Sequence, residues 1–166
     1  MKTVLTIAGS DSSGGAGIQA DLKTYMALGV YGMSAVTAIT AQNTLGVTRI
    51  DPVSPSMIEA QLRAVFEDIP PDAVKIGMLG DEEAVLVTAQ ILEEFQPAHI
   101  VYDPVMASTS GTSLMGESAF ARVKDTLLPL THVITPNLAE AQRLSGLPIR
   151  DKRDMARAAE AIGGDY

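Results

Sequence analysis

Short apolar runs alternate along the chain with segments whose apolar residues recur every three or four positions. The short runs predict strands at residues 4–8, 34–41, 73–76, 99–102 and 132–134. The periodic segments predict helices at residues 18–29, 55–69, 82–95, 117–127, 138–144 and 152–162. Strands that alternate with helices in this way are typical of βαβ units. The pattern therefore predicts an α/β fold with a mainly parallel sheet.

Capping residues support several of these helices. Ser54 precedes Pro55, an N-cap followed by proline at the first helical position, and Asp81 precedes another helix. The last predicted helix ends in Gly163-Gly164 and should lead into a further strand, for which no residues remain. Either the chain end frays, or these residues are the front part of a longer fold.

Composition excludes several classes of protein and site. The 166 residues carry 12 Lys+Arg and 20 Asp+Glu, a net charge of -8, without a basic cluster, which argues against nucleic-acid or anionic membrane partners. The absence of cysteine excludes disulfides and thiolate metal sites. His99 and His132 are too few for a His-based metal cluster, and we expect them to pack or cap near strand starts. No run approaches the roughly 20 apolar residues of a membrane span or resembles a signal peptide, so a cytoplasmic protein is expected.

Residues that could bind a ligand or a metal ion follow each predicted strand. Ligands of open parallel sheets bind outside the carboxyl ends of the strands, so these residues are candidates for one shared site. The alternative is that loop residues are polar without a common function. The candidates are the glycine-rich segment 9–17, Gln42, Gly77-Met78, Asp103-Pro104, and the pair Asn137 and Glu140.

The glycine-rich segment fits two nucleotide-binding patterns poorly. Residues 15–20 match G-x-G-x-x-A, but they begin well after the first strand, and Gln42 stands where an acidic residue would hold a ribose. Gly15-Ala16 also stand where a P-loop requires Lys-Ser/Thr. What remains is a loop whose backbone N–H groups and following helix start can meet a small ligand. The alternative is a tight connection that needs positive φ.

Three side chains near the predicted sheet edge suit a flat heterocycle. The primary amide of Gln42 can pair in a bidentate way with an aminopyrimidine edge, or it can bond local backbone. Asp21 lies beside the apolar stripe of its helix and points toward the loops, or it stands in water near Lys23. Met78 offers an apolar wall for a ring, or it fills a gap in the core.

A second group of residues suits a metal ion and phosphates. Asp103 is held extended by Pro104, and Asn137 and Glu140 share one face at a helix start. Carboxylate and amide oxygens can hold Mg²⁺, directly or through water, beside nucleotide phosphates. The alternative is a capping box made by Asn137 and Glu140.

Five segments, in the same order, resemble motifs of the hydroxymethylpyrimidine/phosphomethylpyrimidine kinases, a family of the ribokinase-like superfamily. The likeness covers essentially the whole chain, and the motifs are specific in combination rather than singly. They are Gly9–Lys23, Ala41–Thr44, Lys75–Leu79, Asp103–Met106 and Thr135–Ala141.

The resemblance implies a three-layer α/β/α fold, a homodimer, and ATP- and Mg²⁺-dependent phosphorylation of 4-amino-5-hydroxymethyl-2-methylpyrimidine and then of its monophosphate. It implies that Gln42 reads the pyrimidine. It places Asn137 and Glu140 in the metal–phosphate region with Asp103 nearby. The other residues that it assigns to the substrate pocket are Asp21, Gly9, Ala16, Met78 and Val105.

Members of this family continue past the equivalent of the last residue here. They carry a later Gly-Thr-Gly segment that stabilises the transferring phosphate, with a Cys or Asp beside it as proton acceptor. No catalytic residue is therefore expected in residues 1–166. We expect them to form the N-terminal, substrate-binding portion of one ribokinase-like domain, incomplete at its C-terminus and inactive alone.

Three other functions remain as alternatives. A non-catalytic pyrimidine-binding or oligomerising fragment would bind without turnover. A pyridoxal kinase of the same superfamily is disfavoured by the combination of Gln42 and Met78. A dinucleotide-dependent oxidoreductase lacks its ribose-binding acid.

Overall fold

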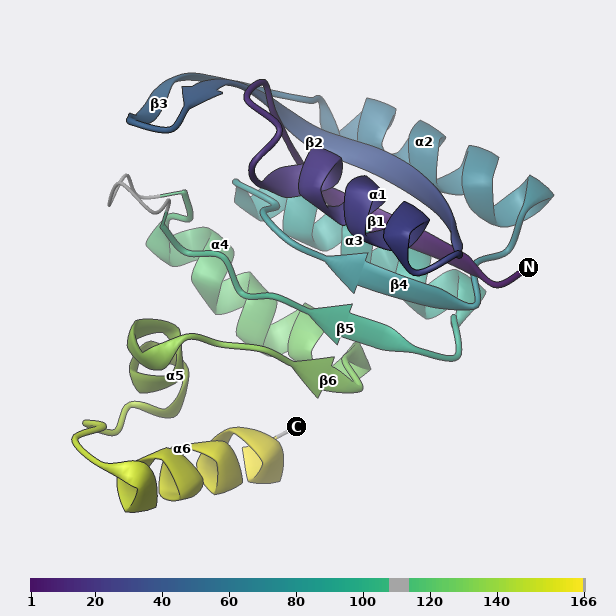
Figure 1. Ribbon diagram of the computed structural model, residues 1–166. Helices are drawn as coiled ribbons and strands as arrows, with labels where there is room; N and C mark the ends of the chain where they lie inside the picture. Colours follow the sequence, from purple (N-terminus) through teal and green to yellow (C-terminus); the bar gives the residue numbers. More distant parts are fainter. Residues whose placement is uncertain (108–113, 166) are drawn as a thin grey trace.

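A computed structural model describes residues 1–107 and 114–165 as an α/β structure around one mixed sheet (Figure 1). The sheet has six strands in the order β3-β2-β1-β4-β5-β6. All neighbouring strands pair in parallel except β3, which runs antiparallel to β2. The strands are β1 (Thr3–Asp11), β2 (Tyr31–Asn43), β3 (Gly46–Pro52), β4 (Ala73–Ile76), β5 (Ile100–Tyr102) and β6 (Val133–Ile134).

Helices cover both faces of the sheet. α1 packs on β1 and β2 from one side, while α2, α3 and α4 form a layer on the other side (Figure 1). α5 and α6 pack against each other near β6. The predicted three-layer α/β/α arrangement is thus confirmed. The helices are α1 (Gly17–Ala27), α2 (Pro55–Asp68), α3 (Glu82–Phe95), α4 (Glu117–Arg122), α5 (Leu138–Ser145) and α6 (Lys152–Asp165), with a π-helical turn at Val123–Leu127 and a 3₁₀ turn at Leu128–Leu130.

The two faces of the central strands differ in chemistry. Successive residues of a strand point to opposite faces. Leu5 and Ile7 of β1 are fully buried in the apolar core that α2 and α3 complete, where Phe66 and Phe95 stack with ring centroids 4.9 Å apart. Thr6, between the two apolar residues, points instead to α1 and donates a hydrogen bond to the Asp21 carboxylate of that helix. Polar groups are therefore collected on the α1 face.

The five predicted strands are all present, whereas β3 is missing from the prediction. Its residues are exposed or half-buried throughout, because it forms the antiparallel edge of the sheet, and no apolar periodicity marks it. Two other expectations are wrong. The helical spacing of apolar residues 18, 22, 25 and 26 predicts one buried stripe on α1, yet Met26 is 78% exposed. α6 continues through Gly163 and Gly164, since a glycine costs a helix only about 1 kcal/mol relative to alanine.

The histidines take the structural positions expected of them, at the amino ends of β5 and β6. The carbonyl of His99 accepts a hydrogen bond from the Val74 N–H, and Nδ1 of His132 accepts one from the Ile100 N–H at 3.2 Å. These contacts lie at the edge of the sheet opposite the carboxyl ends of the parallel strands. Among the described residues, no helix combines the length and the hydropathy that crossing a bilayer requires.

Candidate functional site

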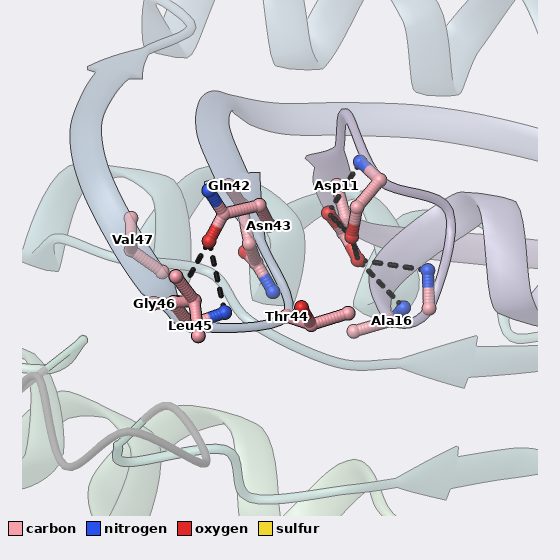
Figure 2. Close-up of a pocket in the computed structure, with 10 residues that line it drawn as sticks. Asp11, Ala16, Gln42, Asn43, Thr44, Leu45, Gly46 and Val47 are labelled. Atoms are coloured by element: carbon pink, nitrogen blue, oxygen red, sulfur yellow. Dashed lines mark hydrogen bonds between the residues drawn. The ribbon is translucent and has the colours of Figure 1, made fainter.

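A cavity of about 290 Å³ opens at the carboxyl ends of β1, β2, β4 and β5. It contains all six residues that the sequence predicts for the substrate pocket, together with Asp103 and Lys75. A second cavity of about 360 Å³ adjoins it between the glycine-rich loop and the β2–β3 turn, and the two share Asp11, Ala16 and Gln42 (Figure 2). The six predicted residues are Gly9, Ala16, Asp21, Gln42, Met78 and Val105.

Three backbone N–H groups of the glycine-rich loop hydrogen-bond a carboxylate from the same loop. The carboxylate of Asp11 accepts hydrogen bonds from the N–H groups of Ser13, Gly15 and Ala16 at 2.8–2.9 Å (Figure 2). Burial raises the pKa of Asp11, but the hydrogen bonds from Ser13, Ala16 and Gly15 outweigh that effect and lower it overall. Three N–H groups of this loop are therefore bound by the loop's own side chain.

Two glycines lie at close contacts at the mouth of the cavity. Gly17 has φ +56°, and a Cβ there would lie 2.2 Å from the carbonyl oxygen of Gly9. A Cβ on Gly9 would lie 2.5 Å from the terminal methyl of Met78. The missing side chain at Gly9 thus allows Met78 to reach across the end of β1, where it forms part of the cavity wall.

Gln42 is placed by its backbone rather than by its side chain. The hydroxyl of Ser12 donates to the Gln42 carbonyl at 2.7 Å and accepts from the Gln42 N–H at 2.9 Å, which ties the end of β2 to the loop. The β2–β3 pairing is also irregular between Ala41 and Gln42, and such bulges redirect side chains. The Gln42 amide bonds the hydroxyl of Thr40 at 3.2 Å and not local backbone, and it lines both cavities.

A charged cluster forms the floor of the cavity. The Lys75 ammonium donates to Oδ2 of Asp21 at 3.1 Å and lies 3.7 Å from the Asp103 carboxylate. The hydroxyl of Thr6 donates to the same Oδ2 of Asp21 at 2.6 Å. Burial raises the pKa of Asp103, which Lys75 opposes and Asp21 reinforces. The alternative that Asp21 stands in water near Lys23 is wrong, because the Lys23 ammonium binds the Gly14 carbonyl instead.

Lys75 begins the motif Lys75–Leu79 but is absent from the site residues predicted from the sequence. It lies in β4 between Val74 and Ile76, both fully buried. Lysine is rare at such positions unless it is paired. The lysine between two apolar strand residues is therefore the sequence signal that indicates a buried ion pair. A search for its acidic partners would have indicated Asp21 and Asp103.

Asn137 and Glu140 form the capping box of α5. The Asn137 side chain accepts from the Glu140 N–H at 3.0 Å, and Oε2 of Glu140 accepts from the Asn137 N–H at 2.8 Å. Both residues thus have a structural role at the helix start. Oδ1 of Asn137 and Oε2 of Glu140 accept the two capping hydrogen bonds, so Oε1 of Glu140 is the oxygen that can bind a further partner.

The hydroxyl of Tyr102 links this region to Asp103. Burial, then the negative charges of Glu140 and Asp103, raise the pKa of Tyr102. In the described part of the chain this buried hydroxyl has no hydrogen-bond partner.

Residues 1–107 and 114–165 hold no group of three or more His, Cys, Asp or Glu side chains arranged to bind a metal. The oxygen donors therefore fit Mg²⁺ only as a partial shell, completed by water and phosphate.

Comparison with known proteins gives one consistent result. Residues 11–165 match the phosphomethylpyrimidine kinase family. A hydroxymethylpyrimidine/phosphomethylpyrimidine kinase of Rhizobium meliloti is 55% identical over 159 residues, which are 95% of this chain and 59% of that protein. Its counterpart in Synechococcus elongatus is 51% identical, over 95% of this chain and 60% of its own length. The chain thus spans about three fifths of these curated relatives.

Solved structures agree with the sequence comparison. A phosphomethylpyrimidine kinase from Clostridium difficile superposes with a TM-score of 0.94 at 50% identity, covering 99% of this chain and 71% of that one. The pyridoxal kinase from Staphylococcus aureus, in complex with AMP-PCP and pyridoxal, gives 0.87 at 40% identity, covering 99% and 59%. Both likenesses extend over the strands and loops that form the cavity.

Proposed function

Since the chain belongs to the phosphomethylpyrimidine kinase family, we propose that it binds 4-amino-5-hydroxymethyl-2-methylpyrimidine for ATP-dependent phosphorylation in thiamine biosynthesis. The same site takes the monophosphate for the second phosphorylation. Residues 1–166 supply the substrate-binding portion of the kinase domain. The observation that carries the proposal is the gathering, around one cavity of about 290 Å³, of the six residues that the resemblance assigns to the substrate pocket.

The cavity suits one substituted six-membered ring. Met78 and Val105 provide apolar surface, and Gly9 and Ala16 keep the entrance free of bulk. The Gln42 amide accepts from the 4-amino group and donates to the adjacent ring nitrogen, the bidentate pairing that this side chain makes with aminopurines. These contacts fix the ring so that its hydroxymethyl group is held in one orientation, which is the main protein contribution to phosphoryl transfer.

The nucleotide and Mg²⁺ are assigned to the region of Asp103, Asn137 and Glu140. The negative charges of Glu140 and Asp103 both raise the pKa of Tyr102, which supports a region where two carboxylates can share a hydrated cation. A relative crystallised with AMP-PCP supports the use of ATP. Mg²⁺ bound there would offset the negative charge of the phosphates.

Calorimetry with the hydroxymethylpyrimidine tests the proposal. We expect Gln42→Ala to weaken binding about tenfold or more, since a bidentate amide pair contributes about 1–3 kcal/mol of discrimination. Gln90→Ala, which removes the same side chain from an exposed position on α3, should bind as the wild type does. Equal affinities for wild type and Gln42→Ala would disprove the assignment. Binding without turnover by a full-length kinase that contains these residues would favour the non-catalytic module.

Pyridoxal is the second candidate substrate, because pyridoxal kinases are 40% identical to this chain. Pyridoxal has no amino group adjacent to its ring nitrogen and cannot satisfy both ends of the Gln42 amide. In the same titration we therefore expect pyridoxal to bind more weakly than the pyrimidine and to be insensitive to Gln42→Ala. Tighter binding of pyridoxal would reverse the choice of substrate.

A homodimer is the proposed assembly. Ile39 on β2 is 60% exposed and Leu45 in the β2–β3 turn is 87% exposed, and exposed apolar side chains on an edge hairpin favour contact with a partner. Sedimentation velocity is expected to give a species of twice the chain mass, and Leu45→Glu is expected to shift it toward the monomer. A wild-type monomer at micromolar concentration would contradict the proposal.

A further inference from the structure

The Lys75 ammonium reaches the floor of the cavity from the α1 face of the sheet. Val74 and Ile76 point into the core on the opposite face and are fully buried, so the strand directs Lys75 away from the core. A Cβ on Gly77 would lie 3.1 Å from the Lys75 Nζ. The ammonium therefore sits directly beside the carboxyl end of β4, where the bare backbone of Gly77 leaves room for it.

This ammonium has unused donor capacity. It carries three N–H groups, and within the described residues Asp21 is its one acceptor within hydrogen-bond distance. The Asp103 carboxylate, at 3.7 Å, attracts the charge without accepting a hydrogen bond of ordinary length. The Lys75 side chain is 23% exposed and lines the cavity. At least one N–H is thus available to a molecule in the cavity.

The surrounding charges determine which kind of acceptor this N–H can bind. Asp21 and Asp103 together outweigh the single positive charge of Lys75, so the cluster is negative as a whole when both are ionised. A phosphate or carboxylate placed against it would meet net repulsion. A neutral acceptor, such as an aromatic ring nitrogen, receives the hydrogen bond without that penalty.

Lys75 and Gln42 reach the same cavity from strands on either side of β1. Lys75 is level with Thr6 of β1, whereas Gln42 lies eight residues beyond Ser34, the β2 residue that pairs with Thr6. The Gln42 amide bonds the Thr40 hydroxyl, which donates to the Ser10 carbonyl near the end of β1, so the two side chains approach the cavity from different levels of the sheet. A six-membered ring that lies in the cavity between them can contact Lys75 at one edge and Gln42 at the other.

We propose that Lys75 is a specificity-determining residue, which donates a hydrogen bond to the pyrimidine ring nitrogen remote from the amino group. Gln42 reads the amino group and its adjacent nitrogen, and Lys75 reads the other nitrogen. This inference rests on the proposed function, because it concerns the same cavity and ligand. It predicts that the protein distinguishes a pyrimidine from a pyridine of the same shape.

A double-mutant cycle between protein and ligand provides the test. The ligands are the hydroxymethylpyrimidine and its aminopyridine analogue, in which CH replaces the remote ring nitrogen. The wild type is expected to bind the analogue about tenfold more weakly, since hydrogen bonds to charged groups are the stronger ones. Lys75→Met keeps the length of the side chain but has no donor, and it should bind both ligands equally. If Lys75→Met discriminates between them as well as the wild type does, the inference is wrong.

Two further variants separate recognition from structural support. Lys75→Arg retains a charged donor, so it should keep at least part of the preference for the pyrimidine. If Lys75→Met alone unfolds, the double variant Lys75→Met, Asp103→Asn replaces it in the test, because it removes one positive and one negative charge together. This double variant should bind both ligands equally. A preference that survives in this double variant also overturns the inference.

The outcome for Lys75 is distinguishable from that of the proposed function. If the wild type binds the pyrimidine and Gln42→Ala weakens that binding, the proposed function stands whatever Lys75→Met shows. If the wild type binds neither ligand, both proposals fail. If it binds both equally while Gln42 matters, only the role of Lys75 is wrong.

Discussion

Gly17→Ala is expected to lower the free energy of unfolding by on the order of 3 kcal/mol. Two costs combine at this position. The backbone has φ +56°, where any residue other than glycine is strained. The new methyl group would also lie 2.2 Å from the Gly9 carbonyl oxygen, a backbone atom that cannot rotate away. Urea denaturation of wild type and variant, compared at the same denaturant slope, measures the difference.

Gly163→Ala is the matched control for this substitution. Gly163 lies in α6, and nothing stands within 4 Å of a Cβ placed there. The same chemical change should therefore raise the free energy of unfolding by about 0.5–1 kcal/mol, through helix propensity. Equal stability of Gly17→Ala and wild type would show that the start of α1 does not approach the end of β1 as described.

Asp11→Ala is expected to lower the free energy of unfolding by about 3 kcal/mol, because hydrogen bonds to a buried charged acceptor are lost together. The substitution leaves the N–H groups of Ser13, Gly15 and Ala16 without their partner. It also removes the negative charge at the start of α1, where no side chain caps the helix. Asp68→Ala, at an exposed position of α2, should change stability by less than about 0.5 kcal/mol.

The stability difference between wild type and Asp11→Ala should depend on pH. The pKa of Asp11 is lowered in the folded protein, relative to about 3.9 in an unfolded chain. The ionised carboxylate thus contributes its full stabilisation above pH 4, and the contribution falls as pH drops through the lowered folded pKa. Chemical denaturation between pH 7 and pH 2.5 should show the two proteins converging. A difference that stays constant would mean that the charge on Asp11 contributes little.

Sequence patterns bring residues to one cavity where those residues lie at the carboxyl end of a strand. Gln42 lies at the end of β2, and Met78 and Asp103 follow β4 and β5, so topology alone brings them to one edge of the sheet. Asp21 depends on helix orientation, which the apolar stripe of α1 leaves loosely defined because only Ile18 is buried there. Its two interpretations were therefore separated only by the structure.

Features set by tertiary contacts were not accessible in the same way. Lys75 was missed because strand patterns treat a lysine as an interruption, whereas here its charge is matched by carboxylates from α1 and from the segment after β5. Asp11 was missed as the acceptor of its own loop, because the same glycines and N–H groups also suit an external anion. Neither case changes the fold, but each changes which groups face a ligand.

The hydroxyl of Ser12 hydrogen-bonds only the backbone carbonyl and N–H of Gln42. Any amino acid except proline at position 42 would offer the same N–H and carbonyl oxygen to Ser12, so this backbone contact does not depend on which side chain recognises the ligand. Substitution there should alter which ring is preferred while the neighbouring loop keeps its shape. With such a scaffold, ligand preference can diversify by single replacements that keep the backbone contact to Ser12.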